Sequence, residues 1–134
     1  MAVLFEKPYL TIIYDEKLNC IQQNWKGFAK SQDFREGITK SLQFLKEKKA
    51  DKILSNTKEF SVVKKEDTDW VAKEITPALV SSGMKKMAFI VPSNVFTQVS
   101  VNNFKDQANA IVSICYFDDV QKAKDWMAGV QETA

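Results

Sequence analysis

Side chains that carry out catalysis are scarce in this chain. It contains no histidine, the commonest general base and metal ligand, so Ser-His-Asp, Cys-His and histidine-based metal sites are excluded. The four glycines stand at positions 27, 37, 83 and 129, a spacing that permits neither a GxGxxG nor a Walker-type phosphate loop. Two distant cysteines cannot form a structural zinc site by themselves. The sequence therefore predicts a protein that is not an enzyme and that holds no cofactor or metal.

The remaining reactive groups have structural explanations. Glu66-Asp67 and Asp118-Asp119 are carboxylate pairs, and both stand at predicted helix starts, where acidic side chains contribute about 0.3–1 kcal/mol. Acid-base catalysis and a metal site are the competing interpretations of these pairs. Cys20 and Cys115 each fall in a predicted strand, so we expect two reduced, buried thiols rather than a disulfide.

Polar side chains follow two of the predicted strands. In an open parallel sheet, ligands bind beyond the carboxyl ends of the strands, so these side chains are candidates for an interaction or ligand site. They are Asn56, Thr57 and Ser61 after one strand, and Ser93 and Asn94 after the next. The same residue types also favour turns and caps for backbone reasons, which gives each of them a structural interpretation as well.

A short, unusually apolar segment follows the second of these polar groups. It includes Phe96, Val99 and Phe104 together with Val95 and Val101. Because one short crossover buries only some of these side chains, the rest are candidates for lining a small-molecule pocket or a homodimer interface. Ordinary core packing is the alternative interpretation.

The hydrophobic pattern predicts five strands joined by amphipathic helices. The strands are a hairpin of Leu10–Tyr14 and Cys20–Trp25, followed by Asp51–Asn56, Lys86–Val91 and Ala110–Tyr116, with a polar loop from Thr57 to Lys65. The first expected helix has Ser31 as its N-cap and reaches about Lys48. The second begins near Asp67, is interrupted at Pro77 and ends at Gly83. Ser93 and Ser100 cap two short helical pieces, and Asp118 is the N-cap of the last helix. Gly37, inside the first helix, predicts close packing against a neighbour. The expected fold is α/β, with a five-stranded mixed sheet made of an N-terminal hairpin and three parallel strand-helix units, and about four helices.

Composition narrows the class of protein further. A chain of 134 residues with 45% hydrophobic and 27% charged residues predicts one globular domain, residues 1–134, with its core at about 9–130. The 19 basic and 17 acidic side chains are scattered and Arg35 is the only arginine, so we expect no nucleic-acid partner. No apolar run approaches the roughly 20 residues of a membrane span and no signal peptide is indicated, which predicts a cytoplasmic protein without a membrane span.

Four segments resemble a known family. They are WKGF at Trp25 to Phe28, FREGI at the start of the first helix, KKMAFIVPSNVF at Lys85 to Phe96, and YFDDVQKAKDWM at Tyr116 to Met127. In this order they are similar to the small stand-alone bacterial STAS-like proteins, also called SpoIIAA-like. The resemblance extends from about Tyr9 to Met127 and consists of structural patterns rather than catalytic signatures.

The resemblance implies a non-catalytic regulatory or protein-interaction domain with a protein partner, and we expect it to form a homodimer. In the sigma-factor antagonists of this group, a serine in an Asp-Ser-Ser-Gly type motif accepts phosphate from a partner kinase. The matching place here reads Phe60-Ser61-Val62-Val63, without the flanking Asp and Gly. The layout is also similar to lipid-binding domains of the CRAL-TRIO type, which makes a carrier of a small apolar ligand, held by Phe96, Val99 and Phe104, the alternative function.

Overall fold

The computed structural model describes residues 2–61, 63–92 and 113–129. Its strands are β1 (Ala2–Lys7), β2 (Leu10–Asp15), β3 (Cys20–Gly27), β4 (Lys52–Phe60), β5 (Lys86–Ile90) and β6 (Ser113–Phe117). Its helices are α1 (Ser31–Lys48), α2 (Lys65–Trp70), α3 (Thr76–Ser81) and α5 (Val120–Met127), with a π-helical segment (Val71–Ile75) between α2 and α3. The short helical pieces expected after Ser93 and Ser100 lie outside the described residues.

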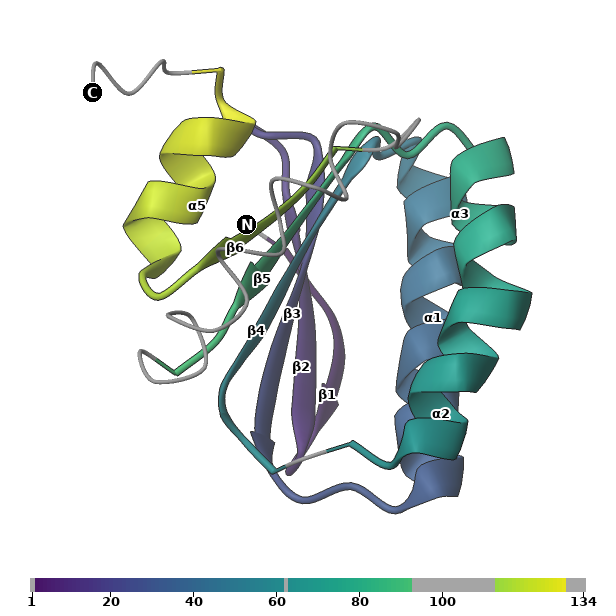
Figure 1. Cartoon of the computed structure of the whole chain (residues 1–134). Helices are drawn as coiled ribbons and strands as arrows, with labels where there is room; N and C mark the ends of the chain where they lie inside the picture. The colour runs from purple at the N-terminus through teal and green to yellow at the C-terminus, as the bar shows by residue number, and fades with distance from the viewer. Residues whose placement is uncertain (1, 62, 93–112, 130–134) are drawn as a thin grey trace.

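The six strands form one mixed sheet in which spatial order follows chain order, from β1 to β6. The strands β1, β2 and β3 are antiparallel neighbours, whereas β3, β4, β5 and β6 run parallel (Figure 1). The α/β class and the mixed sheet are thus confirmed, but the predicted number of five strands is wrong. The additional strand is β1. Its apolar run, Val3 to Phe5, is short, and four of its six residues are exposed, so it does not alternate between a buried and an exposed face as a half-buried strand does.

Helices cover both faces of the sheet, with α1, α2 and α3 on one face and α5 on the other (Figure 1). Successive strand residues point to opposite faces, so the neighbours Ile53 and Leu54 belong to different cores. The core beneath α1 and α3 includes Leu10, Ile12, Ile21, Trp25, Leu45, Ile53, Ile75 and Leu79. The core beneath α5 consists of Cys20, Leu54, Ala88, Ile90, Ala123 and Met127.

The ends of the helices match the expectations in part. The predicted first helix has the bounds of α1. As expected, Gly83 follows the end of α3 with a φ of +99°. The Gly83 N–H donates a hydrogen bond to the Val80 carbonyl, and the Met84 N–H donates one to the Leu79 carbonyl. The expected interruption near Pro77 is the π-helical segment, which directly precedes α3. Two expected N-caps are wrong by one residue: α1 is preceded by Lys30 rather than capped by Ser31, and Asp119 rather than Asp118 caps α5.

The strand β4 is longer than predicted. The expected loop begins at Thr57, but β4 continues to Phe60, because β3 also extends to Gly27 and pairs with it there after a bulge. Backbone pairing depends little on side-chain polarity, so the polar residues Thr57 to Glu59 did not reveal the extension. The expected strand Ala110–Tyr116 corresponds to β6, and its first three residues lie outside the described part of the chain.

Gly37 is in close contact with the sheet, as predicted. A Cβ atom at this position would lie 2.5 Å from Leu10 Cδ2 and 2.9 Å from Trp25 Cη2. The missing side chain therefore lets α1 approach β2 and β3 directly.

Candidate functional site

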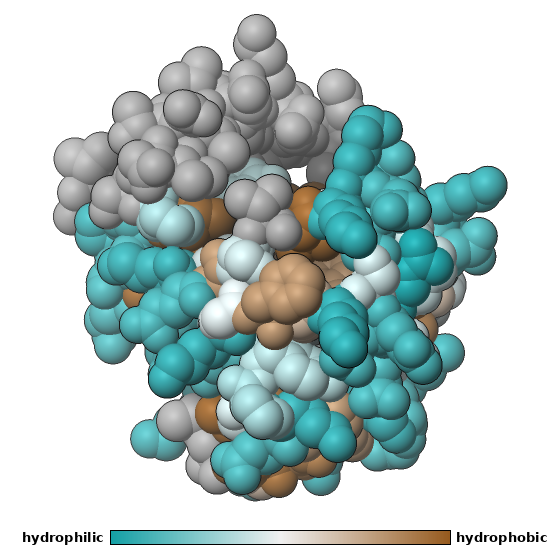
Figure 2. Space-filling model, turned by 90° about the horizontal axis from the view of Figure 1, so that it is seen from below, coloured by the Kyte–Doolittle hydropathy of each residue, from teal (hydrophilic) through white to brown (hydrophobic). Residues whose placement is uncertain are grey.

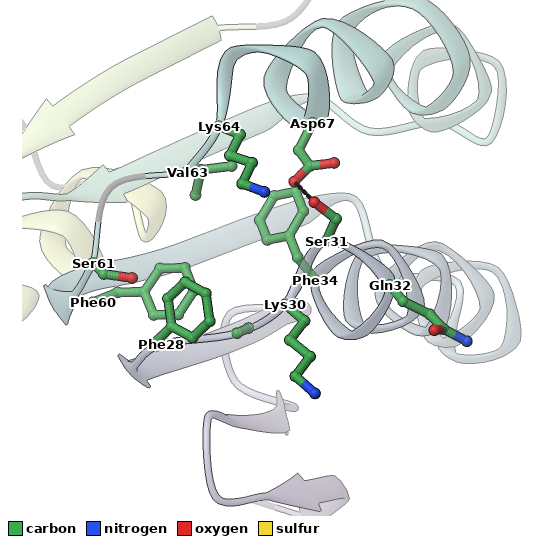
Figure 3. Close-up of a pocket in the computed structure, with 11 residues that line it drawn as sticks. Phe28, Lys30, Ser31, Gln32, Phe34, Phe60, Ser61, Val63, Lys64 and Asp67 are labelled. Atoms are coloured by element: carbon green, nitrogen blue, oxygen red, sulfur yellow. Dashed lines mark hydrogen bonds between the residues drawn. The ribbon is translucent and has the colours of Figure 1, made fainter.

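A pocket of about 300 Å³ lies where the carboxyl ends of β3 and β4 meet the starts of α1 and α2 (Figure 3). Its apolar lining is Phe28, Ala29, Phe34, Phe60 and Val63, and its polar lining is Lys30, Ser31, Gln32, Ser61, Lys64 and Asp67. The two connections that form it, from β3 to α1 and from β4 to α2, are brought together because β3 and β4 pair in parallel. This is the edge at which open α/β sheets bind ligands.

The base of the pocket is a packed group of aromatic rings. The ring centroids of Trp25 and Phe34 are 5.2 Å apart, and those of Trp25 and Phe60 are 5.0 Å apart. Trp25 is held from behind, since its Nε1 donates a hydrogen bond of 3.2 Å to Gln23 Oε1, and Gln23 Nε2 donates one of 2.7 Å to Ser41 Oγ. Both Gln23 and Ser41 are buried, so the rings of the pocket floor rest on a fixed support.

Phe28 is exposed at the edge of this pocket. Gly27, at a φ of +70°, ends β3 and turns the chain, which places Phe28 outside the sheet with 65% of its surface exposed. Figure 2 looks onto this end of the molecule and shows hydrophobic side chains exposed at its centre with hydrophilic ones around them. Among the described residues, only Val3 in β1 is another large hydrophobic residue with comparable exposure, at 59%.

Asp67 joins the two helices that border the pocket. Its carboxylate accepts hydrogen bonds from Ser31 Oγ at 2.7 Å and from Arg35 Nε at 3.0 Å, and Asp67 is only 3% exposed. The Arg35 guanidinium in turn lies over the Trp70 ring, 5.0 Å from its centroid. Burial raises the pKa of Asp67, but the hydrogen bonds from Ser31 and Arg35 and the positive charges of Arg35 and Lys64 outweigh burial and hold this pKa below its ordinary value. Asp67 therefore clamps α2 onto α1 as a carboxylate whose charge is already neutralised.

Two lysines at the pocket, in contrast, form no ion pair within the part of the chain that the structure describes. Lys30 and Lys64 are the residues that precede α1 and α2, both are exposed, and neither makes a side-chain capping hydrogen bond. In Figure 3 the Lys64 side chain extends toward the Phe34 ring, whereas that of Lys30 extends outward on the other side. The pocket thus combines aromatic walls with two positive charges.

The candidate residues found in the sequence divide into three groups. Ser61 lines the pocket, where its backbone N–H donates a hydrogen bond of 2.8 Å to the Gly27 carbonyl. Thr57 and Asn56 make local bonds, since Thr57 Oγ1 donates to the Ile90 carbonyl at 2.9 Å and Asn56 Oδ1 accepts from the Lys58 N–H at 3.2 Å. The candidates Ser93, Asn94, Phe96, Val99 and Phe104 lie outside the described residues.

Asn56 also contributes to a second hollow, of about 430 Å³, at the same edge of the sheet. It pairs in register with Asn24 across β3 and β4, and both side chains line the hollow together with Thr11, Lys58 and Glu59. Gln22 Nε2 donates to Asn24 Oδ1 at 3.1 Å, so the side-chain oxygens of both Asn24 and Asn56 already accept a hydrogen bond. The hollow is mixed in charge and does not include Ser61.

The residues that sequence reasoning missed are Phe28, Lys30, Lys64 and Asp67. Phe28 belongs to the recognised WKGF segment, and its position directly after the turn-forming Gly27 was a usable signal of exposure. Lysine directly before a helix was a second signal, because Ser, Thr, Asp and Asn are the preferred residues there. Asp67 was interpreted as favouring its own helix end, but it binds α1 across 32 and 36 residues of sequence.

The thiols and carboxylates of the described residues offer little for chemistry. Cys20 is free and buried, and burial raises the pKa of its thiol to about 12. Cys115 likewise forms no disulfide, but it is half-buried, so the expectation of two buried thiols is wrong for this residue. No group of three or more Cys, Asp or Glu side chains within residues 2–61, 63–92 and 113–129 is placed to hold a metal ion. Over the same ranges, no helix has both the length and the apolar character required to cross a membrane.

Comparisons of the chain with protein-family models, curated proteins and solved structures find no match. The geometry of the pocket, with an aromatic base, an exposed phenyl ring and two lysines, is suited to binding an apolar group that lies next to negative charge.

Proposed function

We propose that the chain is a non-catalytic, STAS-like regulatory domain that acts by contact with a protein partner. The contact is made through the surface formed by Phe28, Lys30, Phe60, Ser61 and Lys64, called here the Phe28 surface. The observation that carries the proposal is Phe28 itself, a large ring that is 65% exposed beside an aromatic pocket.

The energetics favour a binding role for this ring. Burying an exposed Phe side chain contributes about 1.5–3 kcal/mol, and aromatic residues next to pockets are typical energetic centres of protein interfaces. Phe28 contributes little of this to the fold because most of its surface faces water. The supporting aromatic rings beneath it are held by Gln23 and Ser41, so binding requires little rearrangement of the pocket floor.

The STAS-like part of the proposal is supported by the arrangement of the chain. Antiparallel strands precede parallel strands, and helices connect β3 to β4 and β4 to β5, an arrangement similar to the one that the resemblance implies. Ser61, which matches the phosphate-accepting serine of the antagonists, lies between the end of β4 and the start of α2 and lines the pocket. A partner bound to the Phe28 surface would therefore lie next to Ser61.

Site-specific photo-crosslinking tests the proposal. A photoreactive phenylalanine analogue replaces Phe28 in one variant and Val3, the matched exposed control, in another, and both are illuminated in the cells from which the protein comes. We expect a discrete protein adduct from position 28 alone, and an excess of unlabelled wild-type chain should suppress it, while an excess of the Phe28→Ser chain should not. If the partner is a second copy of the chain, the adduct has twice the chain's own mass and persists in excess wild-type chain, because the unlabelled copy is then the crosslinked partner; this outcome identifies the homodimer. Equal labelling from both positions, or no adduct from position 28, would refute the proposal.

A carrier of a small apolar ligand is the second candidate function. The observation that favours it is the size of the pocket, because about 300 Å³ is the lower end of the range for small-molecule sites and the walls are aromatic. Native mass spectrometry of the purified chain should then reveal a bound apolar mass. Ser61→Trp, which fills the pocket from an exposed position, should remove that mass, and a spectrum of the bare chain alone would refute the carrier function.

A further inference from the structure

The charge of the Phe28 surface identifies the chemistry of its partner. We infer that the partner presents an acidic peptide segment with a large apolar side chain, which enters the pocket while its carboxylates pair with Lys30 and Lys64. This inference rests on the proposed function and adds to it the class of partner.

The charges that line the pocket are positive in sum. Lys30, Lys64 and Asp67 are its charged lining residues, and the Asp67 carboxylate is already bound to Arg35 and Ser31. The acidic residues in the first turns of the two helices, Asp33 and Glu66, do not line the pocket. An acidic segment therefore meets two ammonium groups without an unpaired carboxylate on the pocket wall.

The two lysines stand at positions where they do not help the fold. Helix N-termini favour Ser, Thr, Asp and Asn, whose side chains cap the free N–H groups, and they disfavour positive charge. The start of α5 follows this rule, since Asp119 accepts a hydrogen bond of 3.3 Å from the Lys122 N–H. Lys30 and Lys64 break the rule at the two helix starts that border the pocket. Departures from local preference that cost stability are expected where a residue serves binding.

The other lysine-rich end of the molecule provides a contrast. Lys46, Lys49 and Lys85 surround a hollow of about 380 Å³ at the opposite edge of the sheet. Lys46 lies in the last turn of α1 and Lys49 directly follows this helix, and positive charge is stabilising at a helix C-terminus. The fold thus explains Lys46 and Lys49 without a ligand, and these two form a matched control for Lys30 and Lys64.

Apolar shape adds specificity to the charge. Phe28 and Phe60 line the pocket beside Phe34, and Phe34 and Phe60 both pack on the buried Trp25. An inserted aromatic or large aliphatic side chain would complete this stack of rings. A purely acidic segment would leave the rings exposed, and a purely apolar one would leave the lysines unpaired.

An unbiased peptide selection tests the inference. A displayed library of random dodecapeptides is selected in parallel on the immobilised wild-type chain, on a Lys30→Asp/Lys64→Asp double variant and on a Lys46→Asp/Lys49→Asp double variant. We expect the wild-type chain and the second variant to enrich peptides with Asp or Glu beside Phe, Trp or Leu, and the first variant to lose them. Asp is a preferred N-cap, so the first variant keeps the fold, as circular dichroism should verify.

The selected peptide then gives a quantitative test by fluorescence anisotropy. Each exposed ion pair contributes modestly, so the loss of both should weaken binding about tenfold, and the control variant should bind within about twofold of the wild type. Phe28→Ser should also weaken binding at least tenfold. Selected peptides without acidic residues, equal binding by both double variants, or no selection at all would overturn the inference. If position 28 still crosslinks to a partner in cells, the proposed function survives that failure.

Discussion

Lys30→Asp should stabilise the protein, although it should weaken recognition of an acidic partner. Lys30 has the extended backbone of an N-cap, with φ of −65° and ψ of 158°, and no side-chain capping bond. An aspartate in this conformation accepts a hydrogen bond from the backbone N–H of Gln32 or Asp33, which are the second and third residues of α1. The substitution also replaces a positive charge at the positive end of the helix dipole by a negative one.

The expected gain follows from these two contributions. A capping side chain contributes about 0.5–2 kcal/mol, and a favourable charge in this position about 0.3–1 kcal/mol at low salt. Repulsion from Asp33, an acidic residue already in the first turn, offsets part of the charge contribution. We therefore expect an increase of about 1–2 kcal/mol in the free energy of unfolding, and a rise in Tm of about 3–8 °C for a chain of this size. Lys64→Asp should gain less, because the Lys64 charge helps to keep Asp67 ionised.

Urea denaturation followed by circular dichroism measures the change, with Lys46→Asp as the control. The control makes the same chemical change at the other end of α1, where it places a negative charge against the negative end of the dipole, so it should lower stability by about 0.3–1 kcal/mol. A denaturation midpoint for Lys30→Asp at or below the wild-type value would refute the reasoning. It would mean that the first turn of α1 is already satisfied or that Lys30 has a stabilising contact.

Further predictions concern the core and the other helix starts. Gly37→Ala should lower the free energy of unfolding by about 0.5–2 kcal/mol in urea titrations, because overpacking against Leu10 exceeds the gain in helix propensity. A more stable variant would contradict the close approach of α1 to the sheet. Asp67→Asn should cost about 1–3 kcal/mol at pH 7. Because the pKa of Asp67 is lower in the folded than in the unfolded state, the Asp67 carboxylate stabilises the fold fully above about pH 4, and this stabilisation disappears as the pH falls through the folded pKa. The variant should therefore lose this part of the dependence of stability on acid pH. An unchanged dependence would contradict the role of Asp67 as a clamp. Asp119→Ala should cost about 0.5–2 kcal/mol and Asp118→Ala less, and the reverse order would restore Asp118 as the cap. Cys20 should react with iodoacetamide at pH 8 far more slowly in the native than in the unfolded chain, and equal rates would show that it is accessible.

Local patterns in the sequence determined most of the fold. The bounds of α1, the C-terminal role of Gly83, the hairpin and the order of parallel strands all depend on interactions within a few residues or on hydrophobic periodicity. The errors occurred where pairing with a partner strand, rather than the apolar pattern of the segment itself, supplied the stability. The exposed strand β1 forms only because β2 presents a free edge, and β4 continues through Thr57 to Glu59 because β3 extends beside it.

The candidate site depended on tertiary structure to a greater degree. The sequence marked Ser61 and the edge of the sheet, since parallel strands bring their carboxyl ends together whatever their side chains. It did not determine that Phe28 lies at the mouth of an aromatic pocket, because exposure depends on what the rest of the chain covers. It also did not determine that Asp67 pairs with Arg35 and accepts a hydrogen bond from Ser31, while among the described residues no ion pair engages Lys30 or Lys64. Those pairings join groups more than 30 residues apart, and only the packing of α2 against α1 brings them within hydrogen-bonding distance.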